Sequence, residues 1–488
     1  MAASLERLFS PNSVAIVGAS NREGSMGRAI LTNNLLPFFN RVFPINPKAA
    51  EYGEILGIRA FSSLTECVKK VVEVPDVAVI VIPALSAIDA VEEAAKLGIP
   101  YLVIVTAGFK EVGRQDLEDR LNQVRGENTR IIGPNCIGIR DSFSGIDTMF
   151  PTIERPPPGK IGLVAQSGAL GVDLLLRFTE VNLGLSRFVS YGNAADLNET
   201  DFIQYLGNDP KTAAIGCYLE GVSDGRLFIQ TALEAAKQKP IVAIKVGGDD
   251  VALASLSHTG SLAGDERIYK QVFRQNGILK VQSIEEFVDA LKAVCFQPPT
   301  GGNEVAIVAN TGGPALLAMH QLNARGIRVA TIQQETADRV DSILKKGRIE
   351  MEVIYKGDQP LAHLDLTGSA TTDVLSEVTR VILCDPGVHG VLGIPRSDSP
   401  VVSRDSPSRY ALLDREFPEK PMVIYNLDDP SINRRFEANG IPVFPSPERA
   451  ADGLWALVER GKFLRRIGQP VEKNWQNEFG QNPKTFCQ

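Results

Sequence analysis

A histidine surrounded by small residues is the side chain in this sequence best suited to covalent chemistry. His258 lies in the run Ser-His-Thr-Gly-Ser-Leu-Ala-Gly over residues 257–264. An imidazole has a pKa of about 6.5, so at neutral pH its lone pair can attack phosphorus or accept a proton. Gly260 lets other groups approach closely, while Thr259 and Ser261 offer hydroxyls or a helix N-cap. The pattern predicts a phosphorylated histidine, the alternative being a histidine that only caps or packs in a loop.

Two further groups of residues fit phosphoryl chemistry. The turn Gln166-Ser167-Gly168 separates a predicted strand from a predicted helix over 171–178, where main-chain N–H groups face an anion. Glu220 follows an apolar run, at a place where its carboxylate could accept the imidazole N–H and orient the ring. A glutamate that is merely solvated at a strand end is the alternative.

The first apolar run, residues 13–17, also leads into a glycine-rich turn. Gly18 and Ser20 follow it directly, and Gly27 comes a few residues later. A turn of this kind at the carboxyl end of a strand favours a phosphate-bearing ligand. The spacing does not match GxGxxG, which disfavours NAD, and a purely structural strand-to-helix turn remains an alternative.

Lys48 follows the second apolar run, at the position where Rossmann domains discriminate between nucleotides. An acidic residue there binds a ribose hydroxyl, whereas a lysine suits a phosphate. The residue therefore points to a nucleotide phosphorylated on the 2′ or 3′ oxygen, with a solvated surface lysine as the alternative.

These residues need a scaffold, and the chain supplies short apolar runs that alternate with helical stretches. This alternation predicts an α/β protein with parallel sheets. Breaks rich in proline and glycine, near residues 151–159 and 297–302, separate three such units. We expect a first, Rossmann-like domain and two further α/β domains followed by a tail, over residues 1–150, 159–297, 303–465 and 466–488.

Composition narrows the function classes. The 488 residues carry a net charge of −7, which argues against nucleic-acid binding. Six cysteines are scattered without the spacing of a metal site or a disulfide scaffold, so no metal is expected. The N-terminus does not resemble a signal peptide, and no run approaches the roughly 20 apolar residues of a membrane span. We therefore expect a soluble protein of the cytoplasm.

Six segments occur in a characteristic order: Val17-Gly18-Ala19-Ser20, Asn46-Pro47-Lys48, Thr106-Ala107-Gly108-Phe109-Lys110-Glu111, Gly133-Pro134-Asn135-Cys136-Ile137-Gly138, Gln166-Ser167-Gly168-Ala169, and residues 257–264. Together they resemble the α subunit of NDP-forming acyl-CoA synthetases. These enzymes are relatives of succinyl-CoA synthetase and are best known as ADP-forming acetyl-CoA synthetases. The resemblance covers about residues 8 to 460.

The resemblance implies an N-terminal Rossmann-like CoA-binding domain followed by two flavodoxin-like CoA-ligase domains. It implies that His258 carries the phosphoryl group and that Glu220 steadies it. The phosphate-binding residues would be Gln166, Ser167, Gly168, Thr259, Gly260 and Ser261. The CoA-binding residues would be Gly18, Ser20, Gly27, Lys48, Pro83 and Asn135.

The implied reaction interconverts acyl-CoA, NDP and phosphate with a small carboxylic acid, CoA and NTP, through an acyl phosphate and a phosphohistidine. No ATP-grasp domain follows the third unit, so ATP/ADP or GTP/GDP with Mg²⁺ would bind a separate ATP-grasp β subunit in an α2β2 complex. The sequence departs from the family at Ala362-His363-Leu364-Asp365, where Asn-Pro-Val-Asp is usual. Asp365 is kept.

Two other functions fit parts of the sequence. A catalytically silent CoA-binding regulatory or scaffold protein would share the fold, but it would not need His258, Glu220 and Ser167 together. An NAD(P)-dependent oxidoreductase would need the GxGxxG fingerprint, which is missing.

Overall fold

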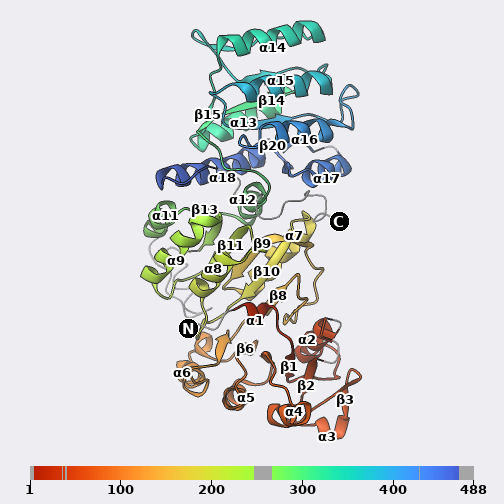
Figure 1. Ribbon diagram of the computed structural model, residues 1–488, viewed down its shortest axis with the longest axis vertical. Coiled ribbons are helices and arrows are strands. Elements are labelled where there is room, and N and C mark those ends of the chain that lie inside the picture. Colours follow the sequence, from red (N-terminus) through yellow and green to blue (C-terminus); the bar gives the residue numbers. More distant parts are fainter. Residues whose placement is uncertain (1–4, 36, 39–40, 247–265, 428, 472–488) are drawn as a thin grey trace. The chain divides into compact units, whose positions relative to one another are not determined.

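The structure is a computed structural model that describes residues 5–35, 37–38, 41–246, 266–427 and 429–471. The chain divides into two compact units, Met1–Lys280 and Val281–Gln488. The first unit contains two larger sheets and the second contains a third; Figure 1 labels the elements along the chain.

The first sheet is parallel and has the strand order β2-β1-β5-β6-β7. Its four-residue strands are apolar and buried along their whole length, because helices cover a parallel sheet. The bounds are β1 Val14–Val17, β2 Val42–Ile45, β5 Val77–Ile80, β6 Tyr101–Ile104 and β7 Arg130–Ile132.

The helices of this domain alternate with its strands, as the sequence predicts. The main ones are α2 Met26–Leu35, α4 Leu64–Val71, α5 Ala84–Leu97 and α6 Gln115–Val124. Small alanines on the buried side of α5 let it pack closely on the sheet, in a core that includes Ile80, Ile104 and Phe109. The short pieces are α1 Glu6–Phe9, α3 Ala49–Tyr52, the hairpin β3 Glu54–Ile55 and β4 Ile58–Arg59, and the 3₁₀ turn Lys110–Val112.

The second sheet is mixed and has the order β13-β12-β11-β9-β10-β8. Its strands are β8 Gly138–Asp141, β9 Pro158–Ala165, β10 Leu185–Ser190, β11 Ala214–Leu219, β12 Ile241–Lys245 and β13 Ile278–Val281. The edge strand β8 pairs antiparallel with β10. The strand β8 precedes the proline-rich break that marks the predicted domain boundary, so a segment before this boundary already belongs to the second sheet. The predicted domain limits stay a prediction.

Side-chain caps define where the helices of this sheet begin. Ser167 caps α7 (Gly168–Glu180), Asp224 caps α9 (Gly225–Gln238), and Asn198 forms a capping box with Asp201 at the start of α8 (Glu199–Asn208). A further helix among the described residues is α11, Glu266–Gln275.

The second unit is built on a parallel sheet of order β15-β14-β19-β20-β21, with β18 also paired to β14. Its strands are β14 Glu304–Ala309, β15 Arg328–Val329, β18 His363–Asp365, β19 Val391–Ile394, β20 Met422–Tyr425 and β21 Val443–Phe444, with a hairpin of β16 Tyr355–Lys356 and β17 Gln359–Pro360.

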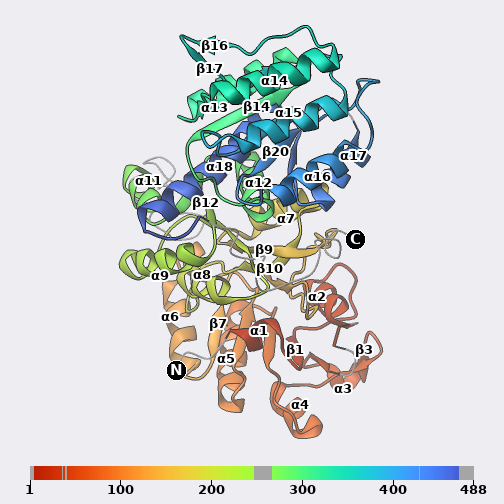
Figure 2. The same cartoon turned by 45° about the horizontal axis from the view of Figure 1, so that its top comes forward.

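Figure 2 shows four helices of this unit, α14 Gln334–Gly347, α15 Thr372–Cys384, α16 Ser406–Glu416 and α17 Pro430–Ala438, which contact one another in series. Another group packs around α18 Pro447–Arg466, which contacts α12 Ile284–Phe296 and α13 Gly312–Ala324. The α18 helix reaches one residue into the predicted tail, and residues 472–488 lie outside the described part. The predicted α/β fold class is confirmed.

Candidate active site

The residues predicted to bind CoA gather at one edge of the first sheet. Gly18 and Ser20 follow β1, Lys48 follows β2, Pro83 precedes α5 after β5, and Asn135 follows β7. The carboxyl ends of parallel strands lie on the same edge, which is where open α/β sheets bind ligands. The structure thus brings these five residues to a common edge, while their contact with CoA stays a prediction.

Gly18 and Gly27 allow the first turn to pack against α2. Gly18 has φ +99°, and a Cβ there would lie 2.6 Å from the carbonyl oxygen of Val81. A Cβ on Gly27 would lie 2.0 Å from the carbonyl oxygen of Gly18. Only glycine fits either position, so the helix begins in direct contact with the turn, as anion-binding turns require.

The turns after β1 and β2 are tied together by Asn46. Its side-chain amide donates to the carbonyl oxygen of Ala19 at 2.8 Å, and its oxygen accepts from the Lys48 N–H at 2.9 Å. The Lys48 side chain is exposed beside this link. Its ammonium is therefore accessible to an anion at the sheet edge.

Asn135 joins this edge to the second sheet. It has φ +57° and follows the cis peptide Gly133–Pro134. Its side-chain amide donates to the Asn193 side-chain oxygen at 3.2 Å, while Gly192 provides the close approach, because a Cβ there would lie 2.3 Å from the Asn135 carbonyl oxygen.

The same contact is reinforced by three charged residues of the first domain. The buried Asn193 amide donates to Glu111 at 2.6 Å and to Glu118 at 2.9 Å. Lys110 donates to the Asn193 carbonyl oxygen and lies 3.2 Å from the Glu118 carboxylate. Burial opposes the charge on Glu111, but hydrogen bonds from Asn193 and nearby main-chain N–H groups hold its pKa below the ordinary value.

In the second sheet, Gln166 and Ser167 stand between β9 and α7. The Ser167 hydroxyl accepts from the Leu170 N–H at 3.4 Å and so caps the helix. Gly168 lets Ile137 approach, since a Cβ would lie 2.7 Å from its methyl group. The N-terminus of α7 therefore follows the carboxyl end of β9 directly, and its role as a phosphate-binding site stays a prediction.

Gln166 and Glu220 are brought together, although 54 residues separate them. The Gln166 side-chain oxygen accepts from the Glu220 N–H at 2.9 Å, from the Gly221 N–H at 3.1 Å and from the Tyr191 hydroxyl at 3.3 Å. Glu220 is only 5% exposed. The alternative of a solvated glutamate is therefore wrong for this residue.

The Tyr218 hydroxyl hydrogen-bonds the Glu220 carboxylate from the same face of β11. Burial and this negative neighbour raise the pKa of Tyr218 well above its ordinary value. The carboxylate thus lies at the carboxyl end of β11, beside the strand that leads into α7.

His258 and its neighbours Thr259, Gly260 and Ser261 lie outside the described residues. The chain enters their segment from β12, whose last residue, Lys245, pairs with Leu219 of β11. The Val246 N–H donates to the Leu219 carbonyl oxygen at 3.2 Å. Val246, the last described residue before this segment, therefore lies beside the end of β11 that leads to Glu220.

Sequence reasoning missed three polar residues at this edge, two of which are buried. Lys245 and Glu199 are 5% and 1% exposed, and Tyr269 lies on α11 with its ring 4.4 Å from the Lys245 ammonium. Burial raises the pKa of Glu199, which accepts a hydrogen bond from the Ser223 N–H at 2.9 Å. The only signal in the sequence was the position of Lys245 at the end of an apolar run. Glu220 has a similar position, because it directly follows such a run.

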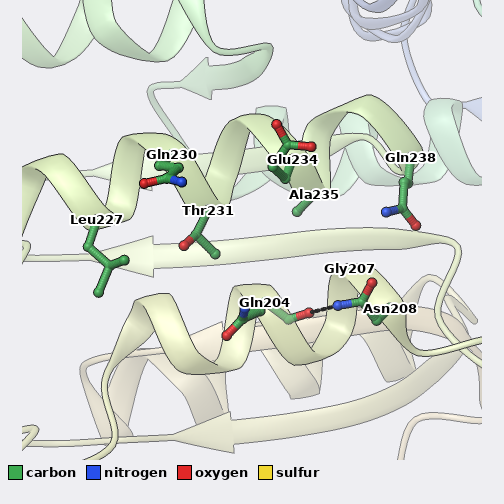
Figure 3. A pocket seen from close by; sticks show the side chains of 9 residues that line it. All are labelled: Gln204, Gly207, Asn208, Leu227, Gln230, Thr231, Glu234, Ala235 and Gln238. Carbon is green, nitrogen blue, oxygen red and sulfur yellow. Dashed lines mark hydrogen bonds between the residues drawn. The ribbon is translucent and has the colours of Figure 1, made fainter.

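A groove of about 220 Å³ runs between α8 and α9 (Figure 3). Its lining is rich in side-chain amides, including Gln204, Asn208, Gln230 and Gln238. None of the predicted site residues lines it. The groove is therefore separate from the strand-end site.

Within the described part of the chain, no three His, Cys, Asp or Glu side chains form a group that could hold a metal ion. None of the helices described is long and apolar enough to cross a membrane.

Two family descriptions match the chain. Residues 12–142 match "CoA binding domain" and residues 158–294 match "Succinyl-CoA ligase like flavodoxin domain". These are the parts that form the two strand-end sites described above. Fold and site together define a CoA-dependent acid–thiol ligase.

Named relatives give the family. The α subunit of ADP-forming acetate–CoA ligase I from Pyrococcus furiosus is 33% identical, over 94% of this chain and 98% of its own length. ADP-forming acetate–CoA ligase from Methanocaldococcus jannaschii is 37% identical over 70% of this chain, which spans about half of that relative, at 47%. The chain belongs to the α-subunit family of ADP-forming acetyl-CoA synthetases.

A solved structure agrees with this assignment. The dinucleotide-forming acetyl-coenzyme A synthetase 1 of Ca. Korarchaeum cryptofilum, in complex with phosphate and ADP, is 30% identical. It has a TM-score of 0.81 and covers 95% of this chain and 98% of its own. The resemblance predicted from the ordered segments is confirmed, as is the acid–thiol ligase class.

Proposed function

We propose that this chain interconverts acyl-CoA, NDP and phosphate with a small carboxylic acid, CoA and NTP, using His258 as a phosphoryl carrier. A phosphate oxygen attacks the thioester carbonyl, and CoA leaves as the thiol, giving an acyl phosphate. An imidazole nitrogen of His258 attacks the phosphorus and releases the carboxylate. The terminal phosphate oxygen of NDP then attacks the phosphohistidine, which forms NTP and restores the imidazole.

The observation that carries this proposal is the position of Glu220 beside the start of α7. A buried carboxylate can accept an imidazole N–H and fix the ring, as in other carboxylate–histidine pairs. The N–H groups that follow Ser167 stabilise phosphoryl oxygens, because the N-terminus of a helix favours negative charge. Gln166, Gly168, Thr259, Gly260 and Ser261 complete the proposed phosphate site.

CoA would lie along the edge of the first sheet. Gly18, Ser20 and Gly27 would admit its phosphates, Lys48 would pair with its 3′-phosphate, and Pro83 and Asn135 would border the path toward the second sheet. The hydrogen bond between Asn135 and Asn193 supports this position for Asn135, because it links the edge of the first sheet to the second sheet. The three proposed domains remain 1–150, 159–297 and 303–465, with the tail at 466–488.

The nucleotide, ADP/ATP or GDP/GTP with Mg²⁺, would bind a separate ATP-grasp β subunit, most simply in an α2β2 complex. The Pyrococcus relative is named as an α subunit and matches this chain over nearly its whole length, which supports a partner. We also place the protein in the cytoplasm, because the described cysteines, Cys67, Cys136, Cys217, Cys295 and Cys384, are all free thiols.

Labelling with ATP tests the mechanism. The chain and its partner, incubated with γ-labelled ATP, should yield an acid-labile, base-stable phosphoprotein that His258→Ala abolishes. His320→Ala, at an exposed histidine on α13, serves as the matched control and should keep the label. Label retained in His258→Ala would refute the carrier role, and CoA binding without turnover of any acid would favour the silent CoA-binding alternative.

A further inference from the structure

The backbone at Glu220 lies one residue beyond the end of β11, where strand pairing no longer supports it. Its N–H and its C=O are nevertheless both bonded, and each to a side chain. The N–H donates to Gln166 at 2.9 Å, and the C=O accepts from the Lys245 ammonium at 2.9 Å. Buried main-chain groups need such partners, so these two side chains determine where Glu220 sits.

Lys245 is itself buried, with only 5% exposure. Its ammonium also donates to the Val246 carbonyl oxygen and lies 4.4 Å from the centre of the Tyr269 ring. The Tyr269 ring packs in turn on Phe273, edge to face, at 5.7 Å. A buried ammonium held by carbonyl oxygens and an aromatic face has a fixed position, because any displacement would expose the charge to an apolar surrounding.

From these contacts we propose that Lys245 is a positioning residue for phosphoryl transfer, which acts by fixing the main chain of Glu220. This inference rests on the proposed function, since it assumes that the Glu220 carboxylate orients the His258 imidazole. Lys245 contacts the main chain of Glu220, so it would serve the reaction through Glu220. Removing its ammonium frees the Glu220 carbonyl and lets the carboxylate drift from the ring.

The chain offers a matched control in Lys292. This lysine is 8% exposed, donates to the Val443 carbonyl oxygen at 2.7 Å and lies 5.6 Å from the centre of the Phe444 ring. It belongs to α12 in the second unit and makes the same two kinds of contact, with an ion pair to Glu437 in addition, without touching Glu220. Lys292→Met therefore reproduces the loss of a buried lysine and leaves the Glu220 support intact.

The experiment uses the complex with its nucleotide-binding partner and measures kcat, KM for CoA and the rate of His258 phosphorylation. Lys245→Met should lower kcat and the phosphorylation rate about 10- to 100-fold, because small misplacements of a catalytic group cost that much. KM for CoA should change less than about 2-fold, since CoA would bind the other sheet. Lys292→Met should lose thermal stability while keeping kcat within about 2-fold.

A double-mutant cycle with Glu220→Gln gives the decisive readout. If Lys245 acts through Glu220, adding Lys245→Met to Glu220→Gln should cost less than about 3-fold more. Multiplicative losses, or a kcat of Lys245→Met within 2-fold of the unmodified enzyme, would overturn the inference. Calorimetric titration with CoA shows whether Lys245→Met is folded. If it is not, Lys245→Gln replaces it, because the glutamine amide can still donate one hydrogen bond, and the same double-mutant cycle is measured.

Failure of the proposed function gives a different result. If the proposed function is wrong, the His258→Ala variant with an intact Lys245 retains the label. If only the present inference is wrong, the Lys245→Met variant is labelled on His258 at the normal rate. Both measurements come from one set of labelling reactions.

Discussion

The side chains of Asn135 and Asn193 meet at 3.2 Å, amide nitrogen to amide oxygen. Asn135 follows the last strand of the first sheet, and Asn193 follows β10 of the second. This hydrogen bond is one of several that join the edge where CoA is proposed to bind to the sheet that bears Glu220. An acyl thioester must present its carbonyl at such a junction if phosphate from the second sheet is to attack it.

Asn193→Asp should weaken CoA binding about 10-fold or more. The substitution removes the amide donor to Glu111 and Glu118 and adds a third negative charge beside them, and hydrogen bonds to charged groups are worth about 1.5–3 kcal/mol. Calorimetric titration with CoA measures the effect. Asn208→Asp, at an exposed site on α8, is the control, and equal affinities for the two variants would contradict the expectation.

Gln166→Leu should destabilise the fold by about 2–4 kcal/mol, because it leaves two buried N–H groups, at Glu220 and Gly221, without their acceptor. Chemical denaturation measures the loss. Gln166→Glu keeps an acceptor oxygen and should lose less stability. A Leu variant as stable as the Glu variant would show that these bonds contribute little.

Gly27→Ala should destabilise the first domain by about 1–3 kcal/mol through overpacking, since the new Cβ would lie 2.0 Å from the Gly18 carbonyl oxygen. CoA affinity should fall with it, because the turn must move. The control is Gly225→Ala at the start of α9, where a Cβ meets nothing within 4 Å. Thermal melts that rank the two variants in the opposite order would refute the close packing.

Glu199→Gln should change how stability depends on pH. Burial raises the pKa of Glu199 above 4.5, so the folded state holds this proton more tightly than the unfolded state. That stability is present below pH 4.5 and is lost as the pH rises through the folded pKa. The variant, whose amide can still accept from Ser223, should therefore melt higher than the parent at pH 7 but not at pH 4.

Calorimetry across this pH range, with Glu234→Gln on the exposed side of α9 as control, measures the difference. A melting-temperature gain that is the same at both pH values would rule out the proton linkage.

The apolar strands of the fold could be predicted from the sequence, because strands such as Val391–Ile394 and Met422–Tyr425 are short continuous apolar runs. The edge strand β8 could not. It contains Arg140 and Asp141, both buried, because Arg140 pairs with Asp147 at 2.6 Å and Asp141 with Arg187 at 2.9 Å. A hydrophobic pattern cannot show that charges are buried when their partners come from elsewhere in the chain.

The same limit applied to the site. Glu220 could be found because a carboxylate after an apolar run is conspicuous, and the turn at Ser167 has the residues of a helix cap. Lys245 ends an apolar run too, but a terminal lysine usually extends into water. Only the fold brings the Glu220 carbonyl and the Tyr269 ring to its ammonium, so its burial could not be inferred from neighbours in the sequence.

The antiparallel pairing of β8 with β10 also limits where this protein can be cleaved or joined to another chain. Cleavage in the proline-rich stretch, or exchange of the N-terminal domain at that point, would separate β8 from its sheet and leave the buried guanidinium of Arg187 without Asp141. The CoA-binding and ligase portions of the first unit therefore cannot be exchanged independently at the proline-rich stretch. Any chimera or split version should place its junction before Gly138, so that β8 stays with the sheet it completes.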